Sequence, residues 1–79
     1  MNVKVMFFGA TADITGHRDI ELSDASGLSA RQVFVDLLNM YPDLSRQKLL
    51  MSVNQQYSIG SEIIKAGDEL AIFTAVSGG

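Results

Sequence analysis

The sequence predicts an α+β fold, a roll in which a mixed sheet is covered by one main helix. Three observations predict it: strand-like runs lie at both ends of the chain, one capped amphipathic stretch lies between them, and the length is 79 residues. A chain of this length forms one small domain, which removes roughly 60% of its unfolded surface from water. We therefore expect a single domain over residues 1–79, with the first and last strands side by side.

The predicted elements follow the order β-β-α-β-(β)-β. Strands are expected at residues 2–8, 17–22, 49–53 and 69–76, and residues 54–58 are expected to form a turn and a short edge strand. Residues 9–16 are expected to form a connection with small residues and room for one helical turn. Gly16 supplies turn chemistry between the first two strands, so they are expected to form a hairpin. The run Leu49–Val53 (LLMSV) is typical of a buried strand.

The helix carries the clearest signals of any element. Ser29 and Gln32 have the spacing of a capping box, in which each side chain bonds the backbone amide of the other residue. An apolar stripe with helical period follows, at Val33, Phe34, Leu37, Leu38 and Tyr41. Pro42 disfavours the helical conformation at the residue before it, so the helix is expected to end at Tyr41.

Composition excludes several classes of function. The chain has no cysteine, and its 6 basic and 9 acidic residues give a net charge of −3, so neither a thiol site nor binding to nucleic acid or an anionic membrane is expected. No apolar run approaches the roughly 20 residues that span a bilayer. We expect a soluble, cytoplasmic domain. Hydrophobic residues nevertheless make up 47% of the chain and charged residues 19%, against about 25% charged in typical domains, so apolar surface is expected.

Alternation along the two terminal strands predicts where this apolar surface lies. In the first strand Lys4 marks the wet face, which places Met6 and Phe8 on that face and opposite the core. In the last strand Leu70 and Ile72 are expected in the core, so that Phe73 points outward. Met6, Phe8 and Phe73 then form an exposed patch of the kind that binds other proteins, with Tyr57 at its rim. The alternative is that the connection 9–16 covers one of the two aromatic rings.

Catalytic constellations are missing from the sequence. Its one histidine, His17, cannot build a metal cluster, no glycine-rich phosphate-binding loop occurs, and the serines have no neighbouring base to activate them. We expect no metal site, no bound cofactor and no enzymatic activity of the chain on its own.

The last residues resist a purely structural explanation. Gly78 and Gly79 bring no packing to a fold, but a backbone without side chains fits into a narrow tunnel. The segment 75–79 gives an extended tail with a reach of roughly 15 Å. Its reactive group is the terminal carboxylate, which must be activated as an acyl adenylate by an enzyme that brings ATP.

In its order of motifs the chain resembles the small subunits of molybdopterin synthase (MoaD), within the ubiquitin-like sulfur-carrier family (MoaD/ThiS). The matching stretches are VKVMFFG at 3–9, VNQ at 53–55, GDELA at 67–71 and FTAVSGG at 73–79. The resemblance implies a β-grasp (ubiquitin-like) fold. It also implies that the Gly79 carboxylate is adenylated by a MoeB-like enzyme and converted to a thiocarboxylate.

The same resemblance implies partners and contact residues. The tail, with Val76, Ser77 and Gly78, would enter a MoaE-like large subunit, where the sulfur on Gly79 passes to a pyranopterin precursor of molybdopterin. Positions matching Phe8, Phe73 and Tyr57 lie at partner contacts in the family, which agrees with the patch that also includes Met6.

Three alternatives remain open. The first is a sulfur carrier for another pathway, such as thiazole synthesis. The second is a modifier that forms isopeptide bonds through Gly79. The third is a β-grasp interaction module whose Gly-Gly is incidental. The Phe-Phe run at residues 7 and 8 favours the molybdopterin carrier over the thiazole carrier.

Overall fold

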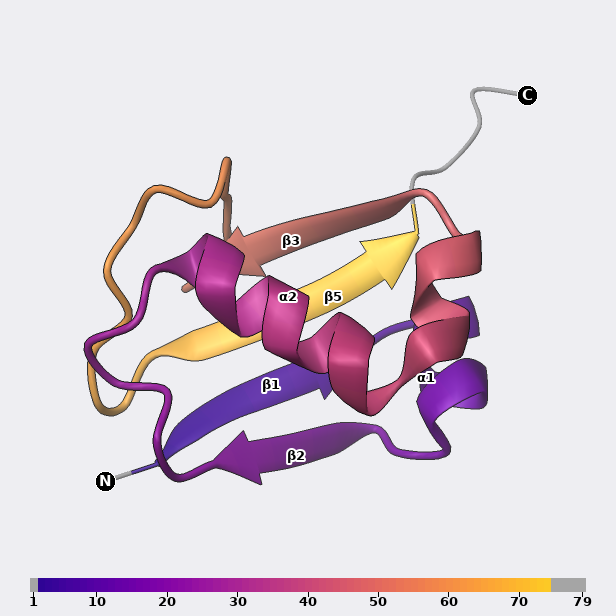
Figure 1. The fold of residues 1–79 in the computed structure, drawn as a ribbon, viewed down its shortest axis with the longest axis horizontal. Helices are drawn as coiled ribbons and strands as arrows, with labels where there is room; N and C mark the ends of the chain where they lie inside the picture. Colours follow the sequence, from indigo (N-terminus) through magenta and orange to yellow (C-terminus); the bar gives the residue numbers. More distant parts are fainter. Residues whose placement is uncertain (1, 75–79) are drawn as a thin grey trace.

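The computed structural model describes residues 2–74. Its five-stranded sheet has the order β2-β1-β5-β3-β4, and the longest helix, α2, lies across one face of it (Figure 1). The strands are β1 (Val3–Phe7), β2 (Asp19–Leu22), β3 (Leu49–Val53), β4 (Gln56–Tyr57) and β5 (Glu69–Thr74). The helices are α1 (Ala10–Thr15), α2 (Ala30–Met40) and the 3₁₀ helix η1 (Pro42–Arg46). This is the predicted α+β roll with one main helix.

The first and last strands lie at the centre of the sheet. β1 pairs in parallel with β5, with Val5 opposite Leu70 and Phe7 opposite Ile72, whereas the other strand pairs are antiparallel. The sheet is therefore mixed, and the predicted neighbourhood of the two terminal strands is confirmed. β3 covers the other side of β5, so β5 has a partner on each side.

The core lies between the sheet and α2. Its buried side chains come from alternate positions of β1 and β5, from one face of α2, from β3 and η1, and from two loops: Val3, Val5, Phe7, Ala25, Ala30, Val33, Leu37, Leu44, Met51, Ile64, Leu70 and Ile72. The predicted helical stripe forms this face, because Phe34, Leu38 and Tyr41 pack against the buried cluster.

The ends of α2 follow the sequence signals, with one exception. Ser29 is the N-cap, and its hydroxyl oxygen accepts a hydrogen bond from the Gln32 amide at 3.1 Å. The Gln32 side chain does not complete the capping box; it donates to Asp36 at 2.9 Å instead, because residues four apart on an exposed helix face are neighbours. Tyr41 caps the C-terminus of the helix immediately before Pro42.

The predicted hairpin of the first two strands is confirmed in its pairing, and its connection contains a helix. β1 and β2 do pair antiparallel, but α1 lies between them, and Gly16 ends this helix in a left-handed conformation with φ 76°. The turn chemistry predicted for Gly16 is therefore that of a helix C-cap. None of the helices in the described part of the chain is long and apolar enough to cross a membrane.

Candidate docking face and family

The face of the sheet opposite α2 carries the predicted patch. Phe8 is 47% exposed directly after β1, and Met6 and Phe73 are partly exposed on the same side of β1 and β5. These three side chains line a shallow depression of about 310 Å³, together with Ser52, Gln55, Glu69 and Ala71. We call Met6, Phe8, Phe73 and their neighbours Tyr57 and Leu50 the docking face.

Tyr57 lies at the rim of the docking face, as the sequence indicates. It is 78% exposed on β4, and its ring centroid is 5.9 Å from that of Phe73, with the two planes tilted by 52°. Aromatic pairs at this separation attract each other beyond their burial of apolar area. The contact holds Phe73 on one side and leaves its other side open to the depression.

The predicted buried strand at residues 49–53 is wrong at Leu50. Met51 is buried, but Leu50 is 39% exposed and is the register partner of Phe73, which places it on the docking face. The signal was present in the sequence, because successive residues of a strand point to opposite faces. With Met51 in the core, Leu50 and Ser52 must face outward.

The connection between β1 and β2 does not cover Phe8; it fixes the backbone beneath it. Thr11 of α1 is fully buried, and its hydroxyl bonds the carbonyl oxygens of Phe8 at 2.7 Å and of Ile72 at 2.9 Å. The Phe8 amide also donates to the Ile72 carbonyl at 3.1 Å. These bonds tie the ends of β1 and β5 together, directly beside Phe8 and Phe73.

The opposite end of β5 is held by a polar network. The Asp68 carboxylate accepts hydrogen bonds from the Lys65 amide at 2.8 Å and the Asn54 side chain at 3.1 Å, and Asn54 in turn accepts from the Glu69 amide at 3.0 Å. Both hydrogen bonds stabilise the ionised carboxylate, the bond from the Lys65 amide more strongly than the bond from Asn54. They therefore hold the pKa of Asp68 below its ordinary value. The network joins the β3–β4 turn to the start of β5.

Four predicted site residues, Val76, Ser77, Gly78 and Gly79, lie outside the described residues. The described part of β5 ends at Thr74, which is opposite Leu49 in the register. Thr74 follows Phe73 directly, so the described part of β5 ends at the margin of the docking face. Within residues 2–74 there is no group of three or more side chains suited to holding a metal ion.

The sequence profile of the ThiS family matches residues 5–79. The chain belongs to this family. The molybdopterin synthase sulfur carrier subunit of Arabidopsis thaliana is 31% identical over 81 residues, which cover 100% of this chain and 84% of that protein. The subunit of the same name from Homo sapiens is 30% identical and covers 98% of this chain and 93% of its own length. The predicted membership of the MoaD/ThiS group is confirmed.

Solved structures agree with this family. SAMP1 from Haloferax volcanii superposes with a TM-score of 0.83 and 25% identity, covering 100% of both chains. A complex of subunits 1 and 2 of the molybdopterin-converting factor of Helicobacter pylori contains a chain with a TM-score of 0.69 and 20% identity, covering 100% of both chains. The predicted β-grasp fold is therefore confirmed.

Proposed function

We propose that this family member carries sulfur on the carboxyl group of Gly79 and delivers it to a pyranopterin precursor of molybdopterin. The observation that carries the proposal is the match over essentially the whole chain to two proteins named as sulfur carrier subunits of molybdopterin synthase. The family profile also extends through Gly79. In this role the chain is a carrier subunit and not an enzyme on its own.

The proposed chemistry has three steps at one carbon atom. A Gly79 carboxylate oxygen attacks the α-phosphorus of ATP held by a MoeB-like enzyme, and pyrophosphate leaves. A sulfide-level donor then attacks the acyl carbon and AMP leaves, which yields the thiocarboxylate. Finally the thiocarboxylate sulfur takes the place of an oxygen substituent on the precursor, and water cleaves the bond between the Gly79 acyl carbon and the sulfur, which returns Gly79 to a carboxylate. The chain binds no cofactor in this scheme, because ATP enters through the activating enzyme, and the reactions take place in the cytoplasm.

The docking face gives the proposal its geometry. Aromatic and Met side chains are enriched at protein interfaces, and Phe8, Phe73 and Met6 surround one depression. A large subunit of the MoaE type would cover this face while Val76, Ser77 and the two glycines enter its active site. The Helicobacter pylori complex, which pairs two subunits of this kind of factor, supports such a partner.

Intact-mass spectrometry tests the first two steps. The chain is incubated with a MoeB-like enzyme, ATP and a sulfur donor, and we expect the mass gain of one oxygen-to-sulfur exchange at the terminal carboxyl group. A chain lacking Gly79 is the matched control and should gain nothing. If the full chain stays unmodified with each MoeB-like enzyme of its organism, the proposal is wrong.

A second candidate is a sulfur carrier for thiazole synthesis, which the name of the matching family favours. Both carriers form a thiocarboxylate, so the third step separates them. The thiocarboxylate form is mixed with a molybdopterin synthase large subunit and the pyranopterin precursor. Formation of the dithiolene product supports the first candidate, whereas transfer only in the presence of a thiazole synthase supports the second. Isopeptide bonds to lysine would instead identify a modifier.

A further inference from the structure

The outer edge of β3 is only half covered by its neighbour. β4 pairs with β3 at two positions, Ser52 and Val53, and the Ser58 amide adds one bond to the Met51 carbonyl at 2.9 Å. Beyond that point no described strand pairs with β3 on this side. An open strand edge is a template for pairing with another chain.

The hairpin geometry identifies the open backbone groups. Asn54 and Gln55 both have positive φ angles, 50° and 70°, as a two-residue turn of the I′ type requires, and Val53 and Gln56 flank it as a hydrogen-bonded pair. Backbone groups alternate in direction along a strand. Those of Met51 and Leu49 therefore point to the outer edge. The Met51 amide and both groups of Leu49 have no partner within residues 2–74.

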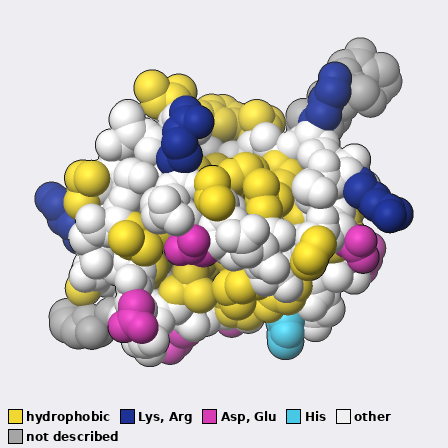
Figure 2. Space-filling model, in the orientation of Figure 1, with side chains coloured by type: hydrophobic (Ala, Val, Ile, Leu, Met, Phe, Trp, Pro, Cys, Tyr) yellow, Lys and Arg dark blue, Asp and Glu magenta, His cyan; other side chains and the backbone are white. Residues whose placement is uncertain are grey.

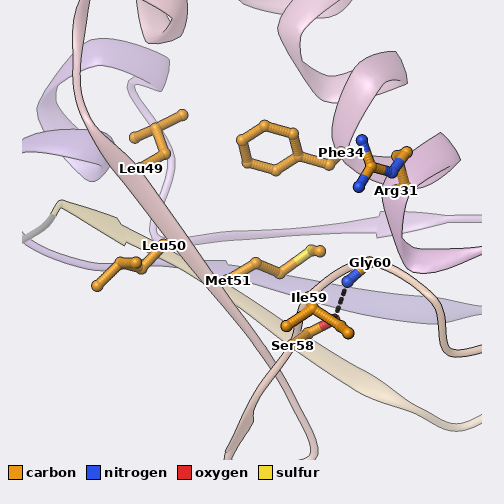
Figure 3. A pocket seen from close by; sticks show the side chains of 8 residues that line it. All are labelled: Arg31, Phe34, Leu49, Leu50, Met51, Ser58, Ile59 and Gly60. Atoms are coloured by element: carbon orange, nitrogen blue, oxygen red, sulfur yellow. Dashed lines mark hydrogen bonds between the residues drawn. The ribbon is translucent and has the colours of Figure 1, made fainter.

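An apolar groove runs beside this edge. It has a volume of about 230 Å³ and is lined by Arg31, Phe34, Leu49, Leu50, Met51, Ser58, Ile59 and Gly60. Figure 3 shows the Phe34 ring pointing from α2 toward Leu49, with Met51 between the helix and the loop that carries Ile59. Ile59 is 84% exposed, so a large apolar side chain stands in water at the rim of the groove.

The one charged residue among those that line the groove is basic. Arg31 lines it and packs over Gly60: a Cβ at Gly60 would lie 3.0 Å from the Arg31 Cβ, and the Arg31 amide donates to the Gly60 carbonyl at 3.0 Å. Figure 2 shows dark-blue side chains above and to the right of a yellow area between α2 and β3, and magenta side chains below it. The nearby Glu62 carboxylate is held by the Ser58 hydroxyl at 2.6 Å, which lowers its pKa, and does not line the groove.

The other open edge, β2, has the opposite character. Asp19 and Glu21 are exposed along it, whereas β3 presents Leu49 and Leu50. Exposed charges on a short strand discourage pairing between sheet edges, and apolar side chains do not. The β3 edge therefore lacks the protection that the β2 edge has.

We propose that the β3 edge binds an extended segment of a partner protein, which adds to the sheet as a further strand. Its backbone bonds Leu49 and Met51, an apolar side chain enters the groove beside Phe34, and a carboxylate faces Arg31. Main-chain bonds of this kind supply affinity, and pockets for alternate side chains supply specificity. A second copy of this chain fits poorly, because its own β3 edge, residues 49–53, carries no carboxylate to face Arg31. The proposal is independent of the chemistry at Gly79.

A displayed library of random decapeptides is the probe for this surface. Selection on the folded chain should enrich peptides with apolar residues at alternate positions and an Asp or Glu near one end. Arg31→Glu should weaken the binding of an enriched peptide about tenfold or more, because the charge-assisted hydrogen bond to the peptide carboxylate is lost. Lys65→Glu makes the same charge change at an exposed loop position away from the groove and should leave the affinity nearly unchanged.

Amide hydrogen exchange then locates the bound peptide. Binding should slow exchange at Leu49 and Met51, whereas the Leu50 amide, which points to β5, should change little. The proposal is overturned if no peptide family is enriched, if Arg31→Glu and Lys65→Glu behave alike, or if protection centres on Phe8 and Phe73. It is also overturned if sedimentation shows that the chain dimerises through this edge.

Discussion

Ile72 and Phe73 are neighbours in β5, yet they lie in different environments. Ile72 is 1% exposed and belongs to the core cluster, whereas Phe73 lines the outer depression and contacts the ring of Tyr57. Both are large apolar residues, so composition alone does not separate them. Their difference shows that one strand can serve stability with one face and recognition with the other, because successive side chains point to opposite sides of the sheet.

The largest expected effect comes from the core side of this comparison. Ile72→Ala removes a buried side chain and leaves a cavity, which should lower the free energy of unfolding by about 2–5 kcal/mol. Urea denaturation measures the loss. The affinity of the remaining folded protein for a large subunit should be little changed. A variant as stable as the wild type would contradict the core assignment.

On the outer side, Phe73→Ala or Phe8→Ala should weaken binding to a large subunit by about 1–3 kcal/mol. The free energy of unfolding should change far less than in Ile72→Ala, because the Phe8 and Phe73 side chains are already partly exposed to water in the folded chain. Calorimetric titration and urea denaturation on the same samples separate the two quantities. A loss of stability similar to that of Ile72→Ala, with affinity retained, would reverse the assignment of the faces.

A smaller effect is expected where the two faces are joined. Thr11→Val removes the hydroxyl that bonds the carbonyls of Phe8 and Ile72, and should cost about 0.5–1.5 kcal/mol of stability. It should also weaken binding of the large subunit, because Phe8 is less firmly placed, and Thr11→Ser should restore affinity.

Thr15→Val is the matched control for Thr11→Val. Thr15 is buried in the same helix, but its hydroxyl bonds only nearby backbone carbonyls. These are the carbonyls of Thr11 and Ala12 in α1 and of His17 just after it. A similar loss of stability without a loss of affinity is expected. If both variants bind equally well, Thr11 serves stability alone.

The smallest effect concerns the far end of β5. Because the pKa of Asp68 is lowered in the folded chain, its carboxylate stabilises the fold above its unfolded pKa, and this contribution is lost as the pH falls through the lower folded pKa. Asp68→Asn should therefore melt slightly below the wild type at neutral pH, and the gap should close below about pH 4. Asp24→Asn, in an exposed loop, is the control. A gap that persists at low pH would contradict this cause.

Much of the fold could be predicted because local signals and burial agree. Lys4 alone decides the orientation of the first strand, since a charge avoids the core, and Val3, Val5 and Phe7 are indeed buried. Ser29 and Pro42 bracket the helix through backbone chemistry that depends on few neighbours. The docking face follows from the same alternation, which is why Met6, Phe8, Phe73 and Tyr57 come together as expected.

Other features depend on contacts that sequence periodicity does not reveal. α1 is six residues long and is held by the buried hydroxyl groups of Thr11 and Thr15, whose partners include β5, 61 residues away. Leu50 is not identified by the sequence pattern, because the apolar run at residues 49–51 does not alternate and so does not show which side chain faces outward. The groove beside β3 depends on how far β4 extends, and a two-residue strand gives too little pattern to predict its end.

The central place of β5 has a consequence for how the chain folds. β5 lies between β1 and β3, and Lys4 near the start of the chain pairs with Glu69 near its end. The two ends of the chain must therefore come together before β1 and β3 are joined in one sheet. Closing such long loops costs entropy before the contacts are gained, so folding should be slower than in a helical protein of similar size. A chain truncated before residue 69 would leave the sheet in two unconnected halves. β5 thus both completes the sheet and leads to residues 75–79. A chain whose synthesis is incomplete therefore has neither the complete sheet nor the tail.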